Sequence, residues 1–188
     1  VRTGYGGGFY VGSNASADLR DCRIHDNKAP NGGSGVCAES GAQLTMARCV
    51  IYRNDNPSGG GLGGLGIGRG TVSVMSNAHA TIINCSIVNN WATYTNGFDR
   101  WGNCGVHVHH AAATVANTIL WESGELAASS TEGLDVRYCR LDAVHMYEGT
   151  WFENVEAYNN STFSFDSTVI SAAPLFVADL SGNVSLQP

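Results

Sequence analysis

The sequence predicts a single all-β domain in which short strands stack in parallel into a solenoid of about five to six coils. Two observations predict this fold. One frame of apolar positions around a cysteine returns five times along the 188 residues. Glycine is abundant, with 24 residues, whereas only 14 % of the residues are charged, and this composition favours short strands joined by tight turns. The apolar positions follow no sustained helical period.

The repeated frame is centred on one position, which we number zero in each unit. Its occupants are Cys22, Cys49, Cys85, Thr118 and Cys139. Two residues later stand Ile24, Ile51, Ile87, Leu120 and Leu141. Three residues earlier stand Leu19, Met46, Ile82, Val115 and Val136, and five residues earlier stand Ala17, Leu44, Ala80, Ala113 and Leu134. Because these positions are apolar or small, apart from one threonine, we expect their side chains to stack in one core.

Two further columns complete each unit. The position five residues after zero is occupied by Asn27, Asn54, Asn90, Ser123 and Val144. We expect the three asparagines to form a ladder at a turn, with amide hydrogen bonds running from coil to coil. Another short strand precedes the frame, in which Phe9/Val11, Val36/Ala38, Val72/Val74 and Val106/Val108 alternate with the outward Tyr10, Cys37, Ser73 and His107.

The spacing of the units predicts where the coils differ. Successive zero positions are separated by 27, 36, 33 and 21 residues. A constant strand frame with unequal connections indicates loops inserted at one corner of stacked coils, whose strands lie about 4.8 Å apart. The two long insertions, 56–70 and 91–104, both follow the asparagine column. A β-sandwich with fortuitous cysteine spacing is the alternative, but it does not explain the matching columns.

Several segments resemble a known family. The stretches NCSIVNN (Asn84–Asn90) and NTILWES (Asn117–Ser123), preceded by GGGFYV and GVHVH, resemble repeats of right-handed parallel β-helix proteins, both of the pectate-lyase-like superfamily and of polymorphic outer-membrane proteins. The segment 173–188 resembles the DPLF…LQP ending of bacterial surface β-helices, with Ala173 in place of Asp. The resemblance implies a right-handed parallel β-helix at a bacterial cell surface or outside the cell, and it implies no particular activity.

We expect residues 1–147 to form the coils and residues 148–188 to form an irregular segment that packs on or caps them. One outward face of the middle coils is unusually apolar, and we regard its residues as interface candidates: Val50, Tyr52, Val88, Ile119 and Trp121. A solvent-facing strand normally carries polar residues at such positions, so a cover is expected. The segment after residue 147, a neighbouring subunit or a partner protein can supply that cover.

The cysteines are interpreted as core residues. Stacked parallel side chains point the same way, whereas a disulfide needs facing Cβ atoms, and no metal-binding spacing is present. Cys37 is expected on an outward position and Cys104 in a loop. Their positions two coils apart, about 9.6 Å, exceed the reach of a disulfide.

The aromatic insertion provides the candidate ligand site, because indole and phenol rings suit sugar rings and an Asp with an Arg suits their polar groups. Its candidates are Trp91, Tyr94, Asp99, Arg100 and Trp101. His107 and His109 share an outward face beside it, and they suit either a metal or acid–base chemistry, or else simply face solvent. Asp55 is a candidate calcium ligand, although a turn rich in Asn and Asp needs no metal.

The formal net charge of −6 disfavours a nucleic acid as the main partner, and no apolar run is long enough to span a membrane. The lyases of the resembled superfamily use acidic calcium ligands and a basic residue, and no such set can be assigned here. We therefore expect a non-catalytic structural or adhesive scaffold without a cofactor, which associates with itself, as in a filament or surface layer, or with neighbouring surface proteins. The alternative functions are a polysaccharide lyase or glycosidase, with calcium as its potential cofactor, or a carbohydrate-binding module, each using the loop 91–104.

Overall fold

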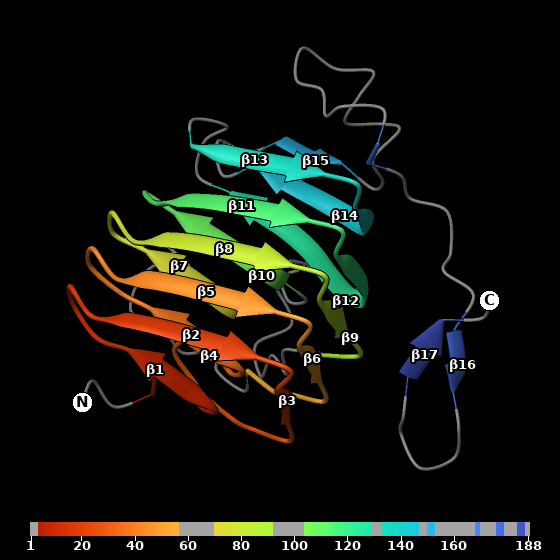
Figure 1. Ribbon diagram of the computed structural model, residues 1–188, viewed down its shortest axis with the longest axis horizontal. Coiled ribbons are helices and arrows are strands. Elements are labelled where there is room, and N and C mark those ends of the chain that lie inside the picture. The colour runs from red at the N-terminus through yellow and green to blue at the C-terminus, as the bar shows by residue number, and fades with distance from the viewer. Residues whose placement is uncertain are drawn as a thin grey trace.

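The computed structural model shows a parallel β-solenoid of about five coils, with three strands in each coil (Figure 1). The structure describes residues 4–56, 70–91, 104–128, 133–146, 150–152, 168–169, 176–178 and 184–186. The predicted fold class is therefore confirmed. Among the described residues, no helix is long and apolar enough to cross a membrane.

Each coil contributes one strand to each of the three faces of the solenoid, and the strands of successive coils stack within each face. We call the first face sheet I, and its strands are β1 (Phe9–Val11), β4 (Val36–Ala38), β7 (Gly70–Met75) and β10 (Cys104–His109). Sheet II contains β2 (Ser16–Arg20), β5 (Gln43–Ala47), β8 (His79–Ile83), β11 (Ala112–Ala116) and β13 (Leu134–Arg137). Sheet III begins with β3 (Arg23–His25), β6 (Val50–Tyr52) and β9 (Ser86–Val88). Neighbouring coils pair in parallel on every face.

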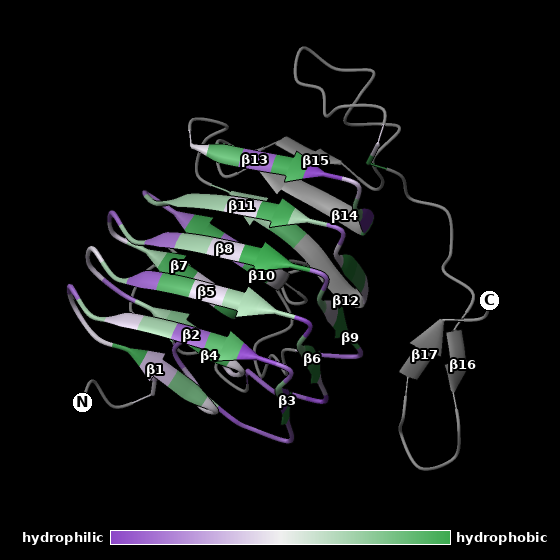
Figure 2. Cartoon of the chain, viewed as in Figure 1, coloured by the Kyte–Doolittle hydropathy of each residue, from purple (hydrophilic) through white to green (hydrophobic). Residues whose placement is uncertain are grey.

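The observed registers place the repeated columns directly on one another. Sheet III pairs Ile24 with Ile51, Ile51 with Ile87 and Ile87 with Leu120. Sheet II aligns the second inward column in the same way, through Leu19, Met46, Ile82, Val115 and Val136. Figure 2 shows the resulting alternation of apolar and polar residues along the strands of sheet II.

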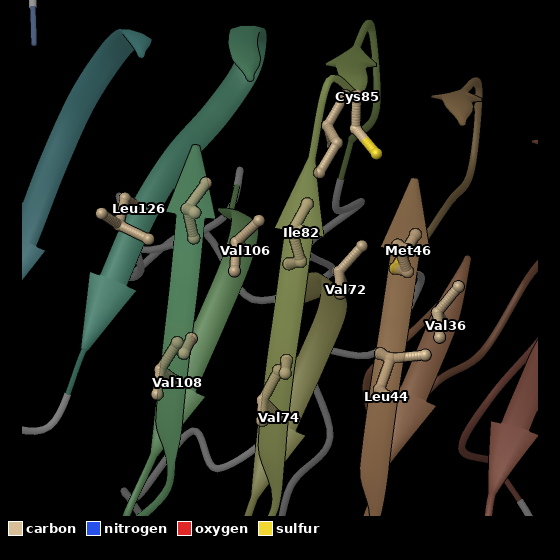
Figure 3. Close-up of a cluster of buried hydrophobic side chains, with 14 of the residues drawn as sticks. Val36, Leu44, Met46, Val72, Val74, Ile82, Cys85, Val106, Val108 and Leu126 are labelled. Carbon is tan, nitrogen blue, oxygen red and sulfur yellow. The ribbon is translucent and has the colours of Figure 1, made fainter. Parts of the chain in front are cut away.

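The core fills the space between the three sheets. Side chains of sheet I such as Val36 and Val72 point toward those of sheet II such as Leu44, Met46 and Ile82 (Figure 3). In the second to fourth coils these inward residues are at most a few per cent exposed. Removing such apolar surface from water supplies the main stabilising free energy of the fold.

The corner between sheets II and III has a feature that the sequence pattern did not predict. The residue before position zero has a positive φ in every coil, between 47° and 56°, at Asp21, Arg48, Asn84, Asn117 and Tyr138. Its backbone N–H donates to the next coil, as from Asp21 to the carbonyl of Ala47 and from Arg48 to that of Ile83. The repeated left-handed residue turns the chain sharply enough for the following cysteine or threonine to point inward.

The fourth coil closes differently from the first three. Strand β12 (Ile119–Ala128) pairs with β9 in sheet III and then, after an irregularity between Leu120 and Glu125, with β10 in sheet I. Strand β14 (Arg140–Met146) follows the same path, so Val144 pairs with Leu126 in sheet I. Aligning Ser123 and Val144 with the asparagine column was therefore wrong, because the strand continues through this corner, where β12 has only three more residues than β14.

Two short antiparallel pairings follow the coils. Strand β15 (Thr150–Phe152) pairs antiparallel with the sheet I part of β14. Strands β16 (Phe176–Ala178) and β17 (Val184–Leu186) pair with each other. Val169 is buried in the core cluster, and Thr168 Oγ1 accepts a hydrogen bond of 3.0 Å from the backbone N–H of Tyr138. These contacts lie within the segment for which we expected a packing or capping role.

Candidate functional site

An asparagine ladder forms the corner between sheets III and I, where both long insertions begin. The backbone N and Nδ2 of Asn27 donate to Oδ1 of Asn54, at 3.1 and 2.9 Å. The same two groups of Asn54 donate to Oδ1 of Asn90, both at 3.0 Å. Asn54 and Asn90 are almost fully buried. The ladder therefore fixes the backbone from which residues 56–70 and 91–104 emerge.

The residues directly after the ladder bring together three different side chains. Isolated bridges align Lys28 with Asp55 and Asp55 with Trp91. Lys28 Nζ lies 3.4 Å from Oδ2 of Asp55, whose side chain is mostly buried. The Trp91 backbone is held by hydrogen bonds with Asn54 and Asn56, whereas 44 % of the residue surface stays exposed. This corner thus sets the partly exposed Trp91 in register with Asp55, which is paired with Lys28.

The other aromatic-loop candidates, Tyr94, Asp99, Arg100 and Trp101, lie outside the described residues. Asp55 remains a candidate calcium ligand only by its chemistry, since the ammonium group of Lys28 lies beside its carboxylate. Over the part of the chain that the structure describes, no three His, Cys, Asp or Glu side chains are grouped to hold a metal ion.

A row of buried polar residues lies on the outer face of sheet I. Tyr10, Cys37, Ser73 and His107 follow one another in register across four coils. His109 stands two residues after His107 at the end of β10, and Glu39 stands two residues after Cys37, just beyond the end of β4. Cys37, Ser73, His107, Glu39 and His109 are each less than a tenth exposed. Tyr10 Oη donates a 2.6 Å hydrogen bond to Oε2 of Glu39.

The expectation that His107 and His109 face solvent was wrong. Both point away from the core, yet they are only 3 % and 8 % exposed. Their ring centroids lie 5.8 Å apart, and the ring of His110 meets that of His109 edge-on at 4.3 Å. Burial lowers the pKa of His109, and the neighbouring His110 lowers it further. His109 is therefore neutral at physiological pH.

Cys37 is also outward but buried, and a glycine turn explains why. Gly33 has a φ of 60°, and a Cβ added to it would lie 2.6 Å from Cβ of Cys37. Gly6 stands in the same relation to Tyr10 in the first coil. The turn thus packs its backbone on the outward residue, which only a glycine permits. Cys104 begins strand β10, so its assignment to a loop was wrong.

The chemistry available on sheet I is limited by this burial. Neutral imidazoles and a carboxylate bonded to a phenol are groups that transfer protons in enzymes. A substrate must reach such groups, and here the carboxylate and both imidazoles are more than nine-tenths buried. The row therefore contains side chains of the types used in acid–base catalysis, but it leaves little surface that a substrate could contact.

The interface candidates form a second ladder on the outer face of sheet III. Tyr52, Val88 and Trp121 are in register on consecutive coils. The ring of His25 stacks on Tyr52 with a centroid distance of 4.8 Å and an interplanar angle of 21°. Val88 points outward but is only 1 % exposed, while Val50, Tyr52, Ile119 and Trp121 are half-buried. The apolar stripe is therefore largely removed from solvent.

The contacts of the stacked cysteines, which we call the cysteine ladder, fit a structural role. The thiols donate to backbone carbonyls two residues earlier, as Cys85 does to Ile83 at 3.3 Å and Cys139 to Arg137 at 3.1 Å. Thr118 takes the same place in the fourth coil, and its hydroxyl donates to Ala116 at 2.9 Å. Burial raises the pKa of Cys85 to about 12, so this group is a neutral thiol rather than a metal-binding thiolate. Cys22, Cys49, Cys85 and Cys139 form no disulfide.

Sequence reasoning missed the Tyr10–Glu39 pair. Tyr10 occupies an outward position of β1 and Glu39 follows the last residue of β4, on the same face as His107 and His109. Extending the alternation of inward and outward positions along β1 and β4 would have placed them there. Such an extension predicts on which face of the sheet a side chain lies. It does not predict the hydrogen bond between these two residues, which are 29 positions apart in the sequence, because that bond depends on the side-chain conformations.

Comparison with known proteins agrees with this architecture. A family model described as a right-handed β-helix region matches residues 2–120 of the chain. Neither a curated protein nor a solved structure matches the chain significantly. The match covers the first four coils up to the start of β12, including the asparagine ladder and the buried polar row of sheet I. This chain belongs to the right-handed β-helix family.

Proposed function

We propose that this chain is a non-catalytic structural and adhesive scaffold of the cell surface or the extracellular space. One observation carries the proposal: side chains that otherwise suit chemistry are engaged in contacts between coils. Asn27, Asn54 and Asn90 bond to one another through their amides. The buried cysteine thiols are bonded to backbone carbonyls.

Charged side chains on the surface repeat this arrangement. Arg48 holds the carboxylate of Asp21 with two hydrogen bonds of 2.6 and 2.7 Å, 27 residues apart. Arg53 binds Asp26 at 2.6 Å across the same interval, and its guanidinium also lies over the ring of Tyr52. These pairs link neighbouring coils. A stack linked on its surface and in its core is suited to act as a stiff support for loops.

The surface location in this proposal rests on the resemblance of the sequence to bacterial surface β-helices. The adhesive part rests on what the coils expose. Trp91 and the half-buried Tyr52 and Trp121 lie at or beside outer faces. Aromatic residues at such places favour contact with other molecules.

The first test asks whether the protein changes a polymer. The purified chain is incubated with polygalacturonate, alginate and neutral glycans, with calcium and with a chelator, and unsaturated products and new reducing ends are measured. We expect neither product. Turnover by the wild-type chain that is lost in Glu39→Gln would overturn the scaffold proposal and would assign catalysis to the buried row of sheet I.

A carbohydrate-contact function is the second candidate, and the exposed Trp91 favours it. Trp91 is in register with Asp55, which is paired with Lys28, so a sugar stacked on the indole would meet polar residues of the neighbouring coils. Affinity electrophoresis in gels containing the same polysaccharides tests this function. We expect Trp91→Ala to abolish any retardation. Tyr138→Ala is the matched control, because Tyr138 is 64 % exposed at the corner between sheets II and III.

A further inference from the structure

A methionine lies beside the two histidines on the buried outer face of sheet I. On β7, Met75 alternates with Val72 and Val74, which belong to the core cluster, whereas Met75 does not belong to it although it is only 4 % exposed. Its partner in register on β10 is His109. Met75 therefore stands on the outward face, about 4.8 Å along the stack from His109.

The two histidines are spaced closely enough to share one metal ion. His107 and His109 lie on the same face of β10 because they are two residues apart. Their ring centroids are 5.8 Å apart, with an interplanar angle of 44°. Metal–imidazole bonds are about 2.0–2.1 Å long, so one ion bound by both rings holds their centroids at most about 6.5 Å apart. The two imidazoles can thus share an ion without a change in the backbone of the strand.

We propose that His107, His109 and Met75 bind one copper(I) ion on the outer face of sheet I. The donor set selects the metal. Zinc sites are built from thiolates, imidazoles and carboxylates, whereas a thioether is a soft ligand that favours copper(I), which imidazole also suits. The described residues contain no cluster of three His, Cys, Asp or Glu side chains for a metal, and this site differs from such a cluster because its third donor is a methionine.

The imidazoles are in the state that a metal ion requires. A ligating histidine must be neutral, and burial holds the pKa of His109 below its ordinary value. Each ring has two nitrogen atoms, so one can bind the ion while the other keeps a hydrogen bond. Protons therefore compete weakly with the metal at neutral pH.

The coils hold the three donors in place. Strand β10 pairs in parallel with β7 on one side and with β12 on the other. A Cβ added to Gly70 would lie 2.7 Å from Cβ of His107, so the backbone of this glycine packs on the base of the histidine side chain. His107, His109 and Met75 are each less than a tenth exposed. Such close support orients metal ligands and shields the ion from water.

An exposed histidine connects the site with the solvent. His110 directly follows β10, and its ring meets that of His109 edge-on at 4.3 Å. A copper ion that arrives from solution can bind this imidazole first and then pass to the buried pair. The entry path that a buried metal site requires is therefore present.

Titration of the purified chain with copper(I), in the absence of oxygen and against a chromogenic copper(I) chelator, tests the proposal. We expect the wild-type chain to bind one ion. Met75→Leu and His109→Gln are each expected to lower the affinity by about tenfold or more, since loss of an outer-shell partner alone costs about 10- to 100-fold. In the selenomethionine-labelled wild-type chain, X-ray absorption at the copper edge is expected to show both nitrogen and selenium neighbours. Cysteine thiols cannot supply the selenium signal.

The chain offers a matched control for each substitution. Met46 is buried in the core on β5, and His79 begins β8 on sheet II. Met46→Leu and His79→Gln are expected to leave the affinity unchanged, and thermal unfolding without copper shows whether each variant is folded.

Three results would overturn the proposal: no binding of copper(I), binding without selenium neighbours, or an equal loss of affinity in the controls. Copper(I) held by the cysteine thiols alone gives the second of these results. The scaffold function does not depend on the ion, so each result would leave that function standing. Polymer turnover by the chain would instead refute the scaffold and leave the copper site in place.

Discussion

The backbone N–H and the side-chain amide of Asn54 both donate to one oxygen atom, Oδ1 of Asn90, which lies 36 residues later in the sequence. Nδ2 of Asn54 also lies within hydrogen-bond distance of the carbonyls of Ile24 and Tyr52. A single buried amide thus joins three coils. It replaces the water that the polar backbone of a sharp corner would otherwise need.

Replacing the side-chain amide of Asn54 should destabilise the fold more than replacing an ordinary polar residue does. Asn54→Ala leaves buried donors and acceptors without partners, so we expect the free energy of unfolding to fall by about 2–4 kcal/mol. Urea denaturation measures the change. Gln43→Ala, which removes an exposed amide at the start of β5, serves as the control and should change stability by less than about 0.5 kcal/mol. Equal effects of the two substitutions would contradict the role of the ladder.

Position zero of the fourth coil should accept the cysteine found in the other coils. Thr118 Oγ1 donates to Ala116 and accepts from the backbone N–H of Cys85 at 3.3 Å. Thr118→Val keeps the shape but loses both bonds, so we expect a loss of about 1–2 kcal/mol. Thr118→Cys retains a weak donor and should cost less. The comparison fails if the cysteine variant is the less stable of the two in urea.

Alkaline pH should weaken the fold through its buried thiols. The pKa of Cys85 is raised in the folded state from 9.0 to about 12, so the folded protein resists losing this proton while the unfolded chain does not. The stabilisation is complete below pH 9 and is lost as the pH rises toward about 12. Stability curves of the wild-type chain and Cys85→Ala should therefore converge over this interval. Parallel curves would contradict the assignment.

Acid should act on His109 in the opposite direction. Burial lowers the pKa of this imidazole below 6.5, so below that pH the unfolded chain binds the proton more readily than the folded one. The stabilisation is present above pH 6.5 and declines as the pH falls through this value. His109→Gln should flatten the dependence of the free energy of unfolding on pH between 7 and about 5. An unchanged slope in His109→Gln would contradict the assignment of this pH dependence to His109.

Substitutions in the outer ladder of sheet III should change the free energy of unfolding as much as substitutions in the core do. Val88 is 1 % exposed between Tyr52 and Trp121, although it points away from the interior. We expect Val88→Ala to lower the free energy of unfolding by about 1–2 kcal/mol, since it removes buried methyl groups and leaves a void. Ser86→Ala on the same strand is the control, with little change expected. A negligible effect at Val88 would show that its neighbours close over the gap.

The columns of the core could be read from the sequence because inward positions share a steric requirement. Leu19, Met46 and Ile82 differ in identity, yet each must fill the same space above the previous coil. The asparagine ladder was legible for a similar reason, since its hydrogen bonds need the same amide in successive coils. Because the same requirement recurs in every coil, it appears in the sequence as a repeated residue type.

Features without a shared side chain were not predictable in this way. The left-handed corner residue is Asp or Asn in three coils, which suits a positive φ, but Arg48 and Tyr138 take the same place in the other two, so no single side chain marks the turn. The burial of His107 was missed because strand alternation gives the direction of a side chain and does not reveal what lies over it. The unbroken path of β12 likewise depends on the neighbouring strands with which it pairs.

The corner after the asparagine ladder has a consequence for how such a chain can change. The spacing between successive zero positions varies from 21 to 36 residues, and yet the registers on both sides of the corner are kept. Insertions and deletions there leave the core untouched, so a loop at this corner can change without refolding the coils. The same tolerance makes the corner a natural place to graft a foreign peptide for display.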